Sequence, residues 1–451
     1  MSRCAKVLLL GLLAAMLAHP AAWSSEATLD DEPPPNSVED LQGPLGQAFR
    51  ERIREKTLFP RLKRKLQTVP PFFRDTELVL KPRWYYLSRR DLDDNRKNAW
   101  TFGGSLAYRS GSWKDVFSLG VEVFTSWKVV GKERHDGTLL LKPGQESYSV
   151  VGQLYAQLRH EDHLLMLYRQ ELDLPYVNKQ DSRMTPNTFE GYTLRGAFSK
   201  LEYVVGHLTR MKKRNEDNFS PMSEAAAVPG NRSRGLSLAG VRYSPSERFS
   251  IGALNYFGKD YLNIFYAETG YTRSLTDELS LKLEAQFTDQ RSVGDDLLTG
   301  SSFNTWVLDG RAAVSFRNAI LTAAFSTTDD EAAVQSPFGS YPGYLSLIQQ
   351  NFFRADEDAW LVGLSYTFSR LGMSGLSAYA NFARGVGARD ADTGAALGDR
   401  TELDLTVAYR VKEGLWRGFW LRLRGSLLKE DGADERSKEV RIILNYQIPV
   451  L

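Results

Sequence analysis

The chain has 451 residues, of which 42% are hydrophobic, with a formal net charge of +2 and a mean hydropathy of -0.36. Beyond its first residues it has no run of about 18 to 20 apolar residues, which excludes conventional membrane-spanning helices. A single cysteine, Cys4, excludes a disulfide framework, and five histidines without clustered spacing give no support for a zinc or haem site. We therefore expect no metal, no cofactor and no nucleic-acid partner.

Residues 1–25 have the three-part pattern of a secretory signal peptide. Arg3 and Lys6 lie at the start of the run "VLLLGLLAAMLA", and small residues follow at positions 21, 22, 24 and 25. The apolar core is too short for an uncleaved anchor, and Cys4 precedes that core, whereas a lipoprotein needs a cysteine directly after it. We expect an exported chain with a net charge of about zero once Arg3 and Lys6 are removed, so any strong field must come from where charges lie.

Residues 26–75 form a separate N-terminal piece, expected in the periplasm. The stretch "LDDEPPPNSVED" is an acidic, proline-rich linker, and "QAFRERIREKTLFPRLKRKLQ" is basic and partly amphipathic. The pattern favours a helix ending at Phe59, with Phe49 and Ile53 on one side, broken by Pro60. A solvated tail, a docking segment and an anion-collecting vestibule all remain open. A plug inside a barrel is disfavoured, because the segment has little apolar surface.

From Glu77 to the end, apolar and polar residues alternate with a period of two. In "ELSLKLEAQF" the apolar face runs from Leu279 to Phe287, and "NTWVLDGRAAVSFR", "AWLVGLSYTF" and "TELDLTVAYRV" behave alike. There are about eighteen such segments of roughly ten residues, separated by alternating tight turns and long polar loops, with aromatic residues near their ends. This pattern predicts an all-β transmembrane antiparallel barrel over residues 76–451, in the outer membrane of a Gram-negative cell.

A soluble β-sandwich or a solenoid would also alternate, but the chain shows no repeat of fixed period. It would also leave unexplained the many charges on strands whose other face is uniformly apolar. A barrel accounts for both faces, because the lumen is wet and the outer face lies in lipid. An open sheet edge cannot face hydrocarbon, so the strands must close.

The same alternation predicts a basic stripe on the inner face of the barrel. Where the first and last strands pair, Lys81, Arg83, Arg410, Arg422, Arg424 and Arg441 fall on one sector of wall. A single-sign stripe in a narrow lumen concentrates anions, and guanidinium groups bind carboxylates through paired hydrogen bonds. The alternative is that Glu402, Asp404 and acidic loop residues neutralise these cations.

Several sequence blocks, in the same order, resemble the OprD family of substrate-selective outer-membrane porins. They are "DLPYVNKQDSRMTPNTFEGY", "GHLTRMKKRNEDNF", "SPFGSYPGYLSLIQQNFFRADEDAW", and the stretches from "TELDLTVAYRV" to "LRLRGSLLK" and "EVRIILNYQIPVL". The first block also accounts for the long polar connection that follows Glu171, since connections of this length are usually functional. Two features depart from the family pattern: a longer basic segment before residue 70, and a C-terminal Leu451 in place of an aromatic residue.

The resemblance implies an eighteen-stranded, monomeric barrel whose third and seventh loops fold inward to form a constriction. It assigns to the third loop Asp181, Ser182, Arg183, Pro186 and Phe189, and to the seventh Phe338, Tyr341 and Tyr344. The arginine ladder of the family corresponds to Arg422, Arg424 and Arg441, and less closely to Arg410 and Arg83. These thirteen residues are the candidate site.

We therefore expect a porin for passive uptake of small anionic or zwitterionic solutes bearing carboxylates, either amino acids or aromatic or aliphatic carboxylates. One alternative is a structural or adhesive barrel with a plugged lumen, suggested by the basic N-terminal segment. Another is an outer-membrane hydrolase, which needs a Ser-His-acid set. Four histidines follow the signal peptide, but no local motif marks a nucleophile. The expected partners are thus solutes and outer-membrane lipid.

Overall fold

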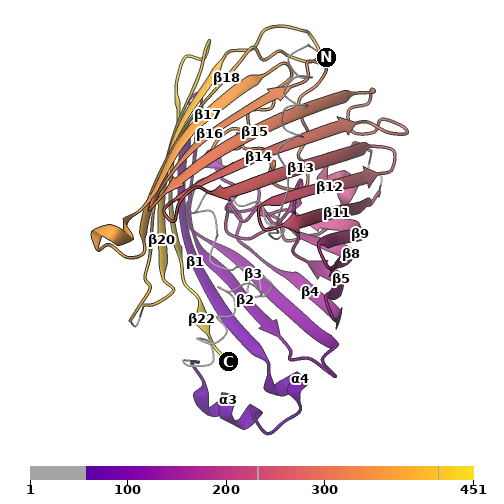
Figure 1. Ribbon diagram of the computed structural model, residues 1–451, viewed down its shortest axis with the longest axis vertical. Helices are drawn as coiled ribbons and strands as arrows, with labels where there is room; N and C mark the ends of the chain where they lie inside the picture. The colour runs from indigo at the N-terminus through magenta and orange to yellow at the C-terminus, as the bar shows by residue number, and fades with distance from the viewer. Residues whose placement is uncertain (1–56, 231–232, 415) are drawn as a thin grey trace.

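The computed structural model describes residues 57–230, 233–414 and 416–451. The predicted signal peptide, the acidic linker and the first part of the basic segment, up to residue 56, lie outside these residues. The described chain forms one closed antiparallel barrel of eighteen long strands, with loop segments lying across its interior (Figure 1). The predicted fold class is confirmed.

The long strands follow one another around the barrel in chain order, each paired with the next, and β1 closes the ring with β21. They are β1 (Glu77–Arg90), β2 (Arg96–Arg109), β3 (Phe117–Gly131), β4 (Tyr148–His160), β5 (His163–Gln170), β8 (Thr188–Phe198), β9 (Leu201–Lys212), β11 (Leu236–Ser246), β12 (Phe249–Gly258), β13 (Leu262–Ser274), β14 (Leu279–Arg291), β15 (Asn304–Phe316), β16 (Ala319–Thr328), β17 (Asp358–Thr367), β18 (Leu376–Val386), β19 (Arg400–Arg410), β20 (Trp420–Glu430) and β21 (Ser437–Asn445).

Four two-residue strands complete the β-structure. β10 (Ser220–Pro221) pairs with β9, and β22 (Ile448–Pro449) continues the pairing of the chain end with β1. β6 (Asp173–Leu174) and β7 (Val177–Asn178) pair only with each other, inside the connection between β5 and β8. That connection therefore has some structure of its own.

Side chains alternate between lipid and lumen as the period of two predicts. On β20, Leu423 and Leu427 are exposed on the outer face, whereas Arg422 and Ser426 are buried on the inner face. The other strands repeat the pattern, with polar residues covered by the loops inside the barrel. None of the helices within the described residues is long and apolar enough to cross a membrane.

Short and long connections lie at opposite ends of the barrel. Two-residue turns at 161–162, 199–200, 247–248 and 317–318 alternate with longer connections at 132–147, 171–187, 213–235 and 329–357. On the long-connection side, 171–187 is the third loop and 329–357 is the seventh, and we call them loop 3 and loop 7. The same side holds η2 (Glu133–His135) and α5 (Met222–Ala225), whereas η3 (Phe368–Leu371) lies in a connection of the other side.

The described part of the N-terminal piece contains two short helices, α3 (Pro60–Leu66) and α4 (Pro71–Arg74). The predicted helix ending at Phe59 is wrong in this part, because residues 57–59 are not helical and Pro60 begins a helix. Proline is well suited to the first turn, since its missing N–H would have no partner there anyway. Phe49 and Ile53 lie outside the described residues.

Candidate functional site

Loop 3 begins by packing onto the wall formed by β12 to β14. Tyr176 is fully buried, and its hydroxyl donates to Oγ1 of Thr288 at 2.9 Å. The hydroxyl of Tyr256 donates to the carbonyl oxygen of Pro175. The ring of Tyr176 also packs edge-on against Tyr266, with centroids 6.3 Å apart. This end of the loop is therefore held by neutral hydrogen bonds and apolar packing.

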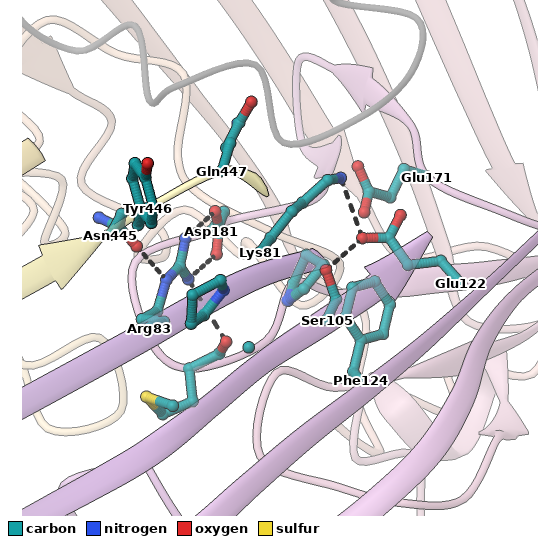
Figure 2. A pocket seen from close by; sticks show the side chains of 14 residues that line it. Lys81, Arg83, Ser105, Glu122, Phe124, Glu171, Asp181, Asn445, Tyr446 and Gln447 are labelled. Atoms are coloured by element: carbon teal, nitrogen blue, oxygen red, sulfur yellow. Dashed lines mark hydrogen bonds and ion pairs between the residues drawn. The ribbon is translucent and has the colours of Figure 1, made fainter. Parts of the chain in front are cut away.

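The second half of loop 3 reaches β1, which lies on the other side of the barrel from β12 to β14 in strand order. The guanidinium of Arg83 grips Asp181 with two hydrogen bonds, Nη1 to Oδ1 at 2.6 Å and Nη2 to Oδ2 at 2.8 Å (Figure 2). Burial alone would raise the pKa of Asp181, but the charge and hydrogen bonds of Arg83 outweigh it and lower the pKa. The hydroxyl of Tyr85 donates to the carbonyl of Ser182 at 3.0 Å. Loop 3 thus crosses the lumen.

Loop 7 is bonded directly to loop 3. Nδ2 of Asn178 donates to the carbonyl of Ser340 at 3.0 Å, and the amide of Ser340 donates back to Oδ1 at 2.8 Å. Phe338 and Tyr341 are buried, and the Tyr341 hydroxyl donates to Oδ2 of Asp309 on β15 at 3.0 Å. Tyr344 is only half-buried, and its ring centre lies 4.4 Å from Cζ of Arg311. The two loops form one connected layer across the interior.

The far end of loop 7 is held by the acidic residues of β19. The amides of Gln349 and Gln350 donate to Glu402 at 2.7 and 3.0 Å, and the amide of Ile348 donates to Asp404 at 2.9 Å. The alternative derived from the sequence is that these two carboxylates neutralise the basic stripe. Both accept backbone hydrogen bonds that fasten loop 7 to the wall, and the charge of Arg424 also acts on Asp404.

The five candidate arginines lie on four adjacent strands, β19, β20, β21 and β1, and face inward. Arg424 stands directly opposite Arg441 across β20 and β21. Arg422 and Arg410 both contact the ring of Trp420, with Cζ at 4.1 and 5.6 Å from its centre. Like charges in directly opposite positions destabilise a sheet. Their juxtaposition here therefore argues for a role other than holding the barrel together.

The partners of these arginines differ along the stripe. Arg424 donates from Nε to Oγ1 of Thr406 at 3.2 Å and from Nη2 to the Tyr379 hydroxyl at 3.0 Å. Arg441 pairs with Glu439 and donates to the carbonyl of Ile348 at 2.8 Å. Arg83, by contrast, is fully engaged by Asp181, Asn445 and loop carbonyls.

A narrow cavity of about 30 Å³ adjoins Arg83 between β1, β2, β3, loop 3 and the chain end. Lys81 reaches across it to Oε1 of Glu122 at 3.0 Å, with Glu171 close by (Figure 2). Cations and carboxylates alternate around this cavity. It is lined by Lys81, Pro82, Arg83, Gly104, Ser105, Glu122, Phe124, Glu171, Asp181, Met184, Pro186, Asn445, Tyr446 and Gln447.

The remaining candidates of loop 3 are buried within the layer. Nε of Arg183 donates to the carbonyl of Thr138 at 2.8 Å, which links loop 3 to the connection 132–147 between β3 and β4. The carbonyl of Pro186 accepts from the buried Nζ of Lys212 at 2.9 Å. Phe189 is the second residue of β8, so it belongs to the wall and not to the loop, and it is fully buried in an apolar cluster that includes Tyr176.

Two basic residues of the site escaped the sequence interpretation. Lys212, at the end of β9, is buried. Its Nζ donates to Oγ1 of Thr185 and to the carbonyl of Pro186, both in loop 3, and to the carbonyl of Lys213 in the connection 213–235. Arg214 donates to Oγ of Ser182 at 2.5 Å, and its burial, together with the charge of Arg441, lowers its pKa to about 10. In the sequence, the block "RMKKRN" contributes only to the family resemblance. The signal that could have identified these two residues is the position of the block at the end of β9.

A sequence model described as "outer membrane porin, OprD family" matches residues 70–450. The chain belongs to the OprD family. It is therefore an outer-membrane channel of the substrate-specific porin type, and not an enzyme. The OprD-family protein Porin D from Pseudomonas aeruginosa is 23% identical over 418 residues, which span 84% of this chain and 92% of Porin D.

Solved structures of related channels share the fold. OccK9 (OpdG) from Pseudomonas aeruginosa has a TM-score of 0.76 at 23% identity, covering 84% of this chain and 100% of its own. A BenF-like porin from Pseudomonas fluorescens Pf-5 has a TM-score of 0.76 at 20% identity, covering 84% and 100%. OpdK from Pseudomonas aeruginosa, crystallised with vanillate, has a TM-score of 0.74 at 20% identity, covering 83% and 99%.

Proposed function

We propose that this OprD-family channel takes up small carboxylate-bearing solutes, which are amino acids or aromatic or aliphatic carboxylates, along the arginine stripe. The observation that carries the proposal is the direct opposition of Arg424 and Arg441 across β20 and β21, with Arg422 on the same strand as Arg424. Three guanidinium groups on two adjacent strands attract anions in a narrow lumen. We expect the channel to act as a monomer.

Arg424 is the best-placed member of this group to meet a solute. It is only partly buried, and its neighbour Leu423 turns outward to lipid. Its hydrogen bonds to Thr406 and Tyr379 use neutral hydroxyls, which are weaker acceptors for a guanidinium than a carboxylate. An incoming carboxylate can replace them and gain a paired, charge-assisted contact. A solute without that charge gains nothing comparable.

One relative supports the solute class. OpdK from Pseudomonas aeruginosa was crystallised with vanillate, which is an aromatic carboxylate. At 20% identity the resemblance concerns the fold, so carrying this solute chemistry to the present channel is part of our proposal. Three aromatic residues near the constriction, Tyr176, Phe338 and Tyr341, are buried within the loop layer and so give no reason to favour aromatic solutes over aliphatic ones.

The test is single-channel recording in planar bilayers with a carboxylate and its uncharged amide added to one side. The reversal potential in a salt gradient should indicate anion preference, and the carboxylate should block or permeate at concentrations where the amide has no effect. Replacing Arg422→Gln and Arg424→Gln together should reduce both responses without unfolding the barrel.

A matched control removes the same amount of charge from another part of the wall. Lys282→Gln with Arg311→Gln deletes two inward cations of β14 and β15, each paired with Glu284. Equal effects of the two double variants would contradict a dedicated arginine stripe. Absence of any open-channel current would instead favour the alternative of a structural or adhesive barrel with a plugged lumen.

A further inference from the structure

The described part of the N-terminal piece exposes apolar side chains beside cations. Leu58, Phe59 and Leu62 are 58%, 55% and 44% exposed. Leu62 and Leu66 lie four residues apart on one face of α3, and Leu58 and Phe59 directly precede the helix. Basic residues flank the apolar face: Arg61, Arg64 and Lys65. Phe73 of α4 adds another apolar side chain, 53% exposed.

This segment is fastened to the short-turn end of the barrel at several points. The amides of Leu58 and Phe59 donate to the carbonyls of Pro449 and Val450 at 3.1 and 3.3 Å. The amide of Gly111, in the turn between β2 and β3, donates to Phe72 at 2.9 Å. Figure 1 shows α3 and α4 beyond the ends of β1 and β2, close to the C-terminus. The segment therefore lies at the rim of the barrel, beside the chain end and the turn between β2 and β3.

We propose that residues 57–74 form an interfacial anchor that binds the anionic headgroups of the membrane leaflet on the short-turn side. Helices with an apolar face flanked by lysine and arginine lie in the headgroup region, with the apolar side chains in the acyl boundary. Basic residues close to an anionic lipid surface are attracted to it, and the attraction falls off within a Debye length. We call residues 57–74 the rim anchor.

The surface next to the rim anchor favours lipid as the occupant. The rim anchor continues the apolar surface that the barrel already presents to the membrane, since Trp113 and Val116 of the adjacent turn are also exposed, at 58% and 40%. The match to the family model begins at residue 70, so α3 lies outside the part of the chain that the family shares. The test of the rim anchor does not depend on the proposed solute.

The test places a fluorescent probe on the rim anchor. The only cysteine of the chain is Cys4, so a Cys4→Ser background allows labelling at a single new site. Leu62→Cys is labelled with an environment-sensitive dye and studied in vesicles of phosphatidylcholine, with or without phosphatidylglycerol. Leu423→Cys, on the lipid face of β20, is the membrane control, and Gln67→Cys, which is exposed just beyond α3, is the water control.

We expect spin-labelled lipids to quench the probe at position 62 as they quench the one at 423, while aqueous iodide quenches only the one at 67. Combining Leu62→Cys with Arg61→Gln, Arg64→Gln and Lys65→Gln should weaken lipid quenching in vesicles that contain phosphatidylglycerol. Quenching at position 62 by iodide would overturn the proposal. So would protection from both quenchers, because a protein segment would then cover this face. An unchanged response of the triple variant would overturn the role of headgroup charge.

Discussion

Loop 3 is held at opposite sides of the lumen by two different kinds of interaction. At β12 to β14 it is held by the buried rings of Tyr176 and Tyr256 and by neutral hydrogen bonds. At β1 it is held by the ion pair of Asp181 with Arg83. Breaking a buried ion pair by removing one partner leaves an uncompensated charge, whereas losing a neutral hydrogen bond has a smaller effect. The charged attachment is therefore the more vulnerable one.

The comparison also separates two roles within the arginine stripe. Arg83 is occupied by loop 3, so its charge is used to hold the constriction. Arg424, two strands away on β20, faces hydroxyl groups and a second arginine. Residues that look equivalent in a strand pattern thus divide into Arg83 on β1, which holds loop 3, and the arginines of β20, which we propose meet the solute.

Removing loop 3 should have the largest effect. Replacing residues 174–186 with a short glycine-serine connection leaves β8 intact and removes both attachments. We expect a several-fold increase in single-channel conductance and weaker discrimination between solutes. Trimming residues 391–394, an exposed loop tip, is the matched control and should leave both unchanged. An unaltered conductance after removal of loop 3 would place the loop outside the conducting path.

Asp181→Asn should release only the charged attachment. It leaves Arg83 buried without its carboxylate, a change that typically destabilises by about 3–5 kcal/mol. We expect noisier channels of higher mean conductance and a lower thermal stability. Tyr176→Phe, which removes one neutral hydrogen bond of about 1 kcal/mol, is the matched variant for the other attachment. If the tyrosine variant opened the channel more, our ranking of the two attachments would be wrong.

Arg424→Gln and Arg83→Gln should change different properties. We expect Arg424→Gln to lower anion preference in a salt gradient while conductance noise stays the same, because its hydrogen bonds to Thr406 and Tyr379 are made to wall strands and not to loop 3. Arg83→Gln should instead raise the noise, because Asp181 loses its partner. Reversal potential and current noise recorded from the same bilayers separate the two effects. Identical behaviour of the two variants would contradict the proposed division into structural and solute-binding arginines.

Acid should loosen the charged attachment only at low pH. Because the pKa of Asp181 is lowered in the folded protein, the stabilisation by the ion pair is complete above the unfolded value of about 3.9. It is lost as the pH falls through the still lower folded value. We therefore expect constant conductance noise between about pH 5 and 7 and an increase only below about pH 4. A transition between pH 5 and 7 would require a different titrating group.

Deleting residues 27–70 should have the smallest effect on conduction. We expect unchanged conductance and at most a modest loss of anion selectivity at low salt, as an anion-collecting vestibule requires. That loss should vanish near ~1 M salt, where the screening length is about 3 Å. A solvated tail would leave selectivity unchanged at every salt concentration. A large rise in conductance would show that the segment is a plug, contrary to our expectation.

Much of the architecture could be predicted from the sequence, because alternation is a local property of a strand. Arg422 and Leu423 must face opposite sides of the sheet whatever their neighbours are, and strands in lipid must close. The inward direction of the arginines and the eighteen-stranded barrel follow from this. The helix that begins at Pro60 could not be predicted in this way. Proline can end a helix or begin one, and only the structural context decides which of the two occurs.

The pairing of charges was decided by the tertiary structure alone. Asp181 meets Arg83, 98 residues earlier in the chain, because loop 3 crosses the whole lumen before it returns to β8. Glu402 holds the amides of loop 7 and not an arginine of the neighbouring strand for the same reason. A period of two specifies which face a side chain occupies, but it contains no information on where an inward-folded loop will land. That depends on barrel closure and on the packing of the loop against the opposite wall.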